Sequence, residues 1–189
     1  MKIAAISGIL GSTLITFLIL MATLLSPWFS WQQNALSDLG VGEVALIFNS
    51  TVFTGGLLNL IFSYGIKKYL PKNSKSIFGV TSLMLASISL SLVGIFTIDY
   101  SLIHTIVALC YFLLSPMALI LISLGAKNLK IKRLSLYLGS LTFIAILLLP
   151  IILISLSFEV GFAVPEIIHS LILGIWTIYM ATNLFRFHN

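Results

Sequence analysis

Charged residues are scarce in this sequence of 189 residues, in which Asp, Glu, Lys and Arg together make up only 8%. Apolar residues make up 59% and the mean hydropathy is +1.16, values that exclude an ordinary soluble domain. Because a membrane crossing takes roughly 20 residues, the length leaves room for about six or seven helical spans. The composition therefore predicts a polytopic membrane protein with no soluble domain beyond its spans.

Cysteine is almost absent as well. The single cysteine, Cys110, lies inside an apolar run, so a disulfide framework within the chain is excluded. No pair of cysteines is available to support a metal site, and one cysteine does not reveal the redox compartment.

Long apolar runs predict an all-α fold, a bundle of six transmembrane helices that forms one domain over residues 1–189. The first run has 23 residues, which is too long for a signal-peptide core. Pro116 and Pro150 lie within spans and predict kinks. Pro165 and Glu166 together indicate a helix start. The predicted helices cover residues 3–25, 44–66, 76–97, 102–125, 135–157 and 164–187.

One side of the predicted bundle lacks acidic residues, and the other lacks basic ones. Six spans place both termini and two basic linkers on one side, where all ten Lys and Arg residues fall. The positive-inside rule makes that side cytoplasmic, in a multi-pass protein of the cell membrane. The net charge of +5 is thus a sign of topology and gives no evidence for a nucleic-acid partner. The five acids on the outer side are Asp38, Glu43, Asp99, Glu159 and Glu166.

The longest polar interruption on the outer side runs from Trp28 to Glu43. We predict that this segment forms the lid or floor of a polar site at the outer membrane face. Polar residues in a span face other helices or a cavity, because lipid offers them no hydrogen-bond partner. The predicted ligand-binding residues are Trp31, Asn34, Ser37 and Glu43 of the segment and Asn49 of the following helix.

Two histidines, His104 and His169, lie about one turn into spans that start on the outer side. Glu166 precedes His169 by three positions, so both share one helix face, a spacing that carboxylate-bridged metal proteins use. Joined by His104 and Asp38, they would form a zinc site with an open position for water, able to hydrolyse an ester or amide. We therefore predict Asp38, His104, Glu166 and His169 as catalytic and metal-binding residues.

A simpler interpretation of the same residues stays open. In it, Glu166 is only a first-turn acid, the two histidines form hydrogen bonds between helices, and Asp38 caps a short helix. The cofactor is accordingly undetermined, with zinc as the candidate.

Asp38 has no basic residue on its side of the membrane. If it is partly buried, its charge must be balanced by a metal, a protonated histidine, amide donors or a cationic ligand, or it must take up a proton. We predict that Asp38 lies within hydrogen-bonding or single-water reach of His104 or His169. Asp99 and Glu159 are predicted to be solvated linker acids.

Several short motifs resemble a known family. Ser37-Asp38-Leu39-Gly40, Phe48-Asn49 and Gly94-Ile95-Phe96 are followed by His104 with Ala108 and Phe112, and by Glu166 at the start of a last helix with Trp176. This set resembles the prokaryotic six-helix membrane family catalogued as domain of unknown function 998. More distantly, it is similar to the eukaryotic family of autophagy modulators and GPI-anchor lipid-remodelling proteins. The first resemblance implies the fold and the place of the site, and the second implies a role in lipid remodelling.

The leading hypothesis is that the outer site recognises or modifies a lipid or lipid-linked headgroup. The alternative is a non-catalytic subunit or scaffold, whose small-residue and serine-rich faces pack against the spans of other membrane subunits. Transport is less favoured, because the middle of every predicted span is uncharged. The sequence leaves open whether the protein is an enzyme. The residues of these faces are Ser7, Gly8, Gly11 and Ser12 in the first helix, and Ser82, Ser87, Ser89 and Ser91 in the third.

Overall fold

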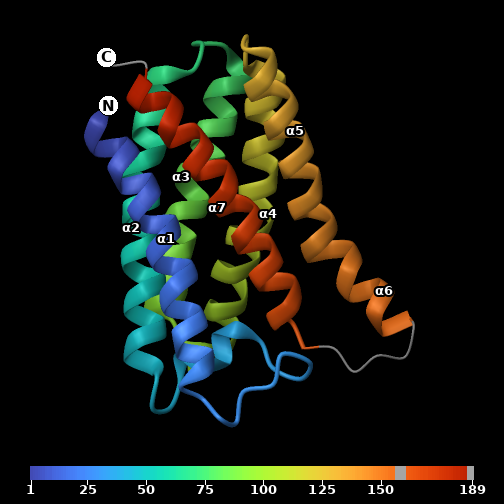
Figure 1. Ribbon diagram of the computed structural model, residues 1–189. Coiled ribbons are helices and arrows are strands. Elements are labelled where there is room, and N and C mark those ends of the chain that lie inside the picture. The colour runs from blue at the N-terminus through green and yellow to red at the C-terminus, as the bar shows by residue number, and fades with distance from the viewer. Residues whose placement is uncertain (156–160, 187–189) are drawn as a thin grey trace.

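The computed structural model describes residues 1–155 and 161–186 (Figure 1). These residues contain helices and no strand, and six of the spans are long and apolar enough to cross a membrane. The predicted all-α bundle is confirmed. The elements are α1 (Lys2–Leu24), η1 (Leu36–Gly40), α2 (Ala45–Tyr69), α3 (Ser74–Ile95), η2 (Ile98–Tyr100), α4 (Ser101–Gly125), α5 (Leu129–Phe143), η3 (Ile144–Leu148), α6 (Leu149–Ser155) and α7 (Ala163–Arg186).

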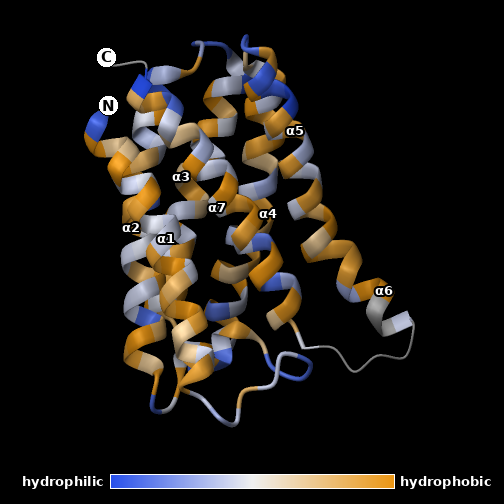
Figure 2. Ribbon diagram, in the orientation of Figure 1, coloured by the Kyte–Doolittle hydropathy of each residue, from blue (hydrophilic) through white to orange (hydrophobic). Residues whose placement is uncertain are grey.

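The start of α1 and the end of α7 lie at one end of the bundle, together with the α2–α3 and α4–α5 connections (Figure 1). Hydrophilic residues colour this end, which we call the basic end, and the apolar middle of the helices separates it from the opposite end (Figure 2). The opposite end, called the acidic end, holds the segment from Trp28 to Glu43, η2 and the start of α7. The two ends therefore divide as the charge pattern predicts.

The fifth span begins earlier than the predicted residue 135, because α5 starts at Leu129. The side chain of Asn128 caps this start and accepts hydrogen bonds from the amides of Lys130 (2.9 Å) and Ile131 (3.3 Å). Lys130 and its basic neighbours, predicted as a linker, are exposed residues on the first turns of a helix. Long basic side chains are compatible with this place, since they can extend toward water from a helix end.

The irregularity predicted at Pro150 takes the form of η3, a π-helical segment just before the proline. Proline lacks the amide that would continue the helical ladder, and a wider turn accommodates that loss. From η3 onward, α6 leads away from the rest of the bundle (Figure 1). The fifth span is consequently the least closely packed at the acidic end.

Small residues allow the other helices to approach closely. A Cβ atom added to Gly8 would lie 2.6 Å from Cδ2 of Phe62, and Gly56 of α2 lies against Ser87 and Ser91 of α3. The predicted small-residue and serine-rich faces are therefore covered by helices of the same chain, which leaves them no open surface for partner spans. All eight of these residues are buried: Ser7, Gly8, Gly11, Ser12, Ser82, Ser87, Ser89 and Ser91.

Candidate functional site

The polar segment at the acidic end is held in shape by its own side chains. Asp38 Oδ2 accepts hydrogen bonds from the Ala35 amide (2.9 Å) and from Asn34 Nδ2 (3.0 Å). Asn34 Oδ1 in turn accepts one from the Ser30 amide (2.8 Å). The bond from Ala35 satisfies the amide at the start of η1, where no intrahelical acceptor exists. Asp38 and Asn34 thus fix the position of η1.

The same segment is bonded to the start of α7. The carbonyl of Gln32 accepts from the Gly161 amide, and the carbonyl of Asn34 accepts from the Ala163 amide (2.9 Å). The Leu36 amide donates to Glu166 Oε2 at 2.6 Å. A side chain at Gly161 would collide with the Asn34 carbonyl, so this crossing requires glycine. Segment and helix together close the acidic end of the bundle.

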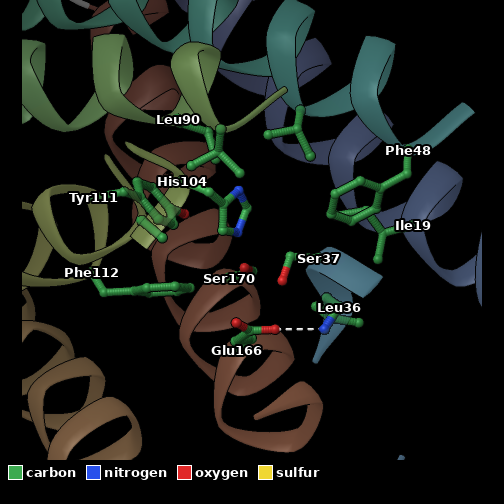
Figure 3. A pocket seen from close by; sticks show the side chains of 13 residues that line it. Ile19, Leu36, Ser37, Phe48, Leu90, His104, Tyr111, Phe112, Glu166 and Ser170 are labelled. Atoms are coloured by element: carbon green, nitrogen blue, oxygen red, sulfur yellow. Dashed lines mark hydrogen bonds between the residues drawn. The ribbon is translucent and has the colours of Figure 1, made fainter. Parts of the chain in front are cut away.

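Behind this closure lies a cavity of about 50 Å³, which we call the small cavity. Ser37, His104, Glu166 and Ser170 face it, and Glu166 bonds the Leu36 amide at its edge (Figure 3). The aromatic rings of Tyr111 and Phe112 and several aliphatic side chains from α1, α2 and α3 complete the wall. The polar groups are therefore contributed by three elements: η1, α4 and α7.

A larger cavity of about 300 Å³, the side cavity, adjoins the small cavity. Its own lining comes from α4, η3 and the start of α7, including Leu109, Leu113, Ile146, Leu147 and Phe162. The two cavities share Ser37, His104, Ala108, Phe112 and Glu166. The polar groups thus stand at the junction of a narrow interior space and a wider apolar one.

His104 has a defined hydrogen-bonding role. Its Nδ1 lies 2.7 Å from the carbonyl oxygen of Phe96, and a carbonyl can only accept, so Nδ1 carries the proton. In the tautomer with the proton on Nδ1, Nε2 is a hydrogen-bond acceptor. Since His104 lines both cavities and is only 9% exposed, that acceptor serves the cavities rather than bulk water.

His169 lies deeper and does not line either cavity. It is fully buried, with Nε2 2.9 Å from Ser115 Oγ. Its ring packs edge-on against Tyr111 and Phe112, with centroids 5.4 and 5.0 Å apart. His169 therefore supports the two rings that line the small cavity.

The four residues predicted as zinc ligands are not gathered into one coordination sphere. Among residues 1–155 and 161–186, no group of three or more His, Cys, Asp or Glu side chains could hold a metal ion. The hydrogen bonds described for Asp38 go to Asn34 and Ala35, and those of His104 and His169 go to Phe96 and Ser115. The described contacts thus form no zinc site and no direct hydrogen bond between Asp38 and either histidine, and the predicted single-water reach between them stays a prediction. Only His104 and Glu166 of the four share a cavity.

The other predicted ligand-binding residues have different places. Ser37 faces both cavities, whereas Asn34 is used within the segment and Glu43 is exposed. Asn49 Nδ2 donates to the Gly40 carbonyl at 2.8 Å. Trp31 is half-buried and packs edge-on against Phe29.

The two predicted linker acids can be compared only in part. Asp99 is exposed, as predicted. Glu159 lies outside the described residues.

Sequence reasoning missed Tyr111, Phe112, Ser170 and the Leu36 amide. Helical spacing could have revealed the first three, because Glu166 and Ser170 are four residues apart. His104, Ala108, Tyr111 and Phe112 follow the i, i+4, i+7, i+8 pattern of one helix face. The Leu36 amide left no signal, since every residue of that segment has one.

Comparison with known families agrees with this geometry. The sequence model of a family described as protein of unknown function (DUF998) matches residues 9–183. The chain belongs to the DUF998 family. The match extends from α1 to α7, so the DUF998 region contains all residues that line the two cavities. No curated protein and no solved structure matches the chain. The more distant similarity to the eukaryotic lipid-remodelling family stays a prediction.

Proposed function

We propose that this DUF998 protein binds the head of a membrane lipid or lipid-linked molecule at the acidic end. The observation that carries the proposal is the pair of adjoining cavities, one narrow and partly polar, the other apolar. Ser37, His104 and Glu166 stand where the two meet. An amphiphile has the same division between a polar group and an apolar chain, and ligand pockets characteristically combine apolar walls with a few polar groups.

We further propose that the acidic end faces the outside of the cell membrane and that both termini are cytoplasmic. Support comes from the basic residues, all ten of which belong to the termini and the two connections at the basic end. Cysteines introduced in place of exposed Gln32 and Lys130, in a Cys110→Ser background, test this orientation. An impermeant thiol reagent added to intact cells is expected to label position 32 and to leave position 130 unlabelled. Labelling of position 130 but not of position 32 would show that the acidic end faces the cytoplasm and would contradict the proposed orientation.

Binding is better supported than catalysis. His104 Nε2 is an acceptor and Glu166 is a carboxylate, so both could take part in acid–base chemistry. However, the described contacts include no hydrogen bond between Ser37 and His104 of the kind that activates a nucleophile. A modifying, zinc-dependent reaction therefore remains a hypothesis, which elemental analysis of protein purified without chelator would test.

The scaffold alternative has lost its structural argument, because the faces assigned to partner spans are buried within the chain. Exposed apolar side chains do remain on all sides, but a bilayer covers such side chains without any protein partner. No specific surface in the described residues favours a partner subunit over lipid.

Native mass spectrometry of purified protein tests the proposal. We expect wild-type protein to retain a lipid that Ala108→Leu excludes, because Ala108 borders both cavities and the larger side chain would obstruct their junction. Thr13→Leu, at an exposed position of α1, is the matched control for added bulk and should retain the lipid. Equal lipid occupancy in wild type and Ala108→Leu would contradict binding at this site.

A further inference from the structure

The small cavity offers hydrogen-bond acceptors, and its lining contains no lysine or arginine. Glu166 contributes a carboxylate, His104 contributes Nε2, and Ser37 contributes a hydroxyl oxygen. Neither cavity has a Lys or Arg in its lining, since every basic residue belongs to the basic end. A head with an anionic group and no ammonium would meet the Glu166 carboxyl group without compensation, whereas an ammonium would stabilise the ionised carboxylate. The charge pattern therefore favours a ligand head that carries a positively charged donor.

The size and walls of the small cavity restrict that group further. One water-sized sphere occupies roughly 10–15 Å³ on this measure, so about 50 Å³ admits only a compact group of a few heavy atoms. Tyr111 and Phe112 place aromatic rings in the wall, and ring faces attract ammonium ions. Three acceptors match the three N–H donors of a primary ammonium. A quaternary ammonium is bulkier and has no N–H to donate.

The side cavity supplies a path for the rest of the ligand. Leu109 and Phe162, both in its lining, are 52% and 53% exposed, so its wall reaches the outer surface of the bundle. Leu109 and Leu113 lie eight and twelve positions after Ser101, which places them about 12 and 18 Å along α4 at 1.5 Å per residue. The side cavity therefore runs from the polar junction to the depth of lipid chains. It lies beside η3, where the fifth span leads away from α4 (Figure 1).

We propose that the ligand is a membrane lipid with a primary ammonium head, which enters sideways between α4 and η3. Its ammonium occupies the small cavity beside Glu166, His104 and Ser37, and one acyl chain lies in the side cavity. This inference rests on the proposed lipid-binding function and adds the chemical class of the head and its route. The Leu36 amide holds Glu166 in place for the ammonium, through the 2.6 Å bond to Oε2.

Competition among lipids with identical chains tests the head chemistry. Delipidated protein is incubated with dioleoyl phosphatidylethanolamine, phosphatidylcholine or phosphatidylglycerol, and bound lipid is counted by native mass spectrometry. We expect wild-type protein to prefer phosphatidylethanolamine at least tenfold over the other two. Glu166→Gln keeps the side-chain shape and removes the charge, so the preference should fall to within about twofold. Asp99→Asn, at an exposed acid of the same end, should leave the preference unchanged.

The possible results separate the two proposals. If Ala108→Leu excludes bound lipid but wild type shows no preference for phosphatidylethanolamine, the ammonium inference is wrong and the proposed function stands. If Ala108→Leu leaves the occupancy of all three lipids unchanged, both fail. Should Glu166→Gln not fold, the wild-type preference still decides, because it alone distinguishes a primary ammonium from choline and glycerol heads. A preference that survives in folded Glu166→Gln would overturn the role of the carboxylate.

Discussion

The two ends of the bundle use buried polar groups in different ways. Toward the basic end, Trp176 is fully buried, donates from Nε1 to Ser135 Oγ at 2.8 Å and packs edge-on against Phe62. There the polar contact joins two helices directly. At the acidic end, His104 and Glu166 each use one atom to fix their position and face a cavity with the rest. The difference fits the proposal that the acidic end binds a ligand, while the basic end serves stability.

The largest expected loss of unfolding free energy comes from substitution of Trp176. Trp176→Ala removes a fully buried ring and leaves Ser135 without its partner. Such truncations typically cost about 3–5 kcal/mol of unfolding free energy. Reversible unfolding in mixed micelles would measure the loss, and lipid retained per folded molecule should not change. A variant with wild-type stability but no bound lipid would break the proposed division between the two ends.

A smaller loss of unfolding free energy is expected from substitution of Gly161, where the segment from Trp28 to Glu43 crosses the start of α7. Gly161→Val forces side-chain atoms against the Asn34 carbonyl, so the segment must shift away from α7. Overpacking of this kind costs about 1–3 kcal/mol. Here, unlike at Trp176, lipid occupancy should fall along with stability. Gly42→Val is the control, because a side chain at Gly42 meets nothing within 4 Å, although its φ of +82° adds some backbone strain.

Substitutions of Asp38 distinguish a structural role in the segment from a role in ligand binding. Asp38→Ala removes the acceptor of the Ala35 amide and of Asn34, and the loss of such a cap typically costs about 1 kcal/mol. Asp38→Asn keeps one acceptor oxygen and should cost less. The effect on lipid occupancy should be smaller than that of Glu166→Gln, measured on the same preparations. A larger effect from Asp38→Asn would restore Asp38 as a ligand-binding residue.

The smallest expected loss of unfolding free energy comes from substitution of Ser115. Ser115→Ala removes the hydrogen bond to His169 between α4 and α7, and such bonds in membrane proteins average about 0.6 kcal/mol. Unfolding in mixed micelles would detect the change, with Ser50→Ala, at an exposed position of α2, as the control. The preference for phosphatidylethanolamine over the other two lipids should persist, because Ser115 does not line the small cavity. A loss of preference would show that His169 positions Tyr111 and Phe112 for the ligand.

The fold could be predicted because its determinants are local in sequence. Apolar runs of the required length mark the six spans, and the distribution of Lys and Arg separates the two ends. The boundary at Leu129 was missed because basic residues suggested a linker, while the cap at Asn128 outweighed that signal. The π-helical form of η3 depends on how the fifth span packs, and proline alone indicated only an irregularity.

The site could be predicted only in part. Ser37, His104 and Glu166 were identified because polar residues near the ends of spans are rare and conspicuous. The described residues do not gather into the predicted zinc site, because residue type does not determine the partner. The Phe96 carbonyl, the Ser115 hydroxyl and the Ala35 amide, all contributed by the fold, hold the side chains expected to meet at a metal. Pairwise spacing along one helix could not anticipate these contacts between elements.

The bond between Leu36 and Glu166 joins residues 130 positions apart, and this separation has a consequence for biogenesis. A chain is synthesised from its amino terminus, so the first four spans can be in the membrane well before α7 is translated. Until then the segment from Trp28 to Glu43 lacks its partners at the start of α7, and the small cavity lacks one wall. A nascent chain arrested before Ala163 would accordingly be an inserted membrane protein without a binding site, and competence for the ligand would arise only with the last helix.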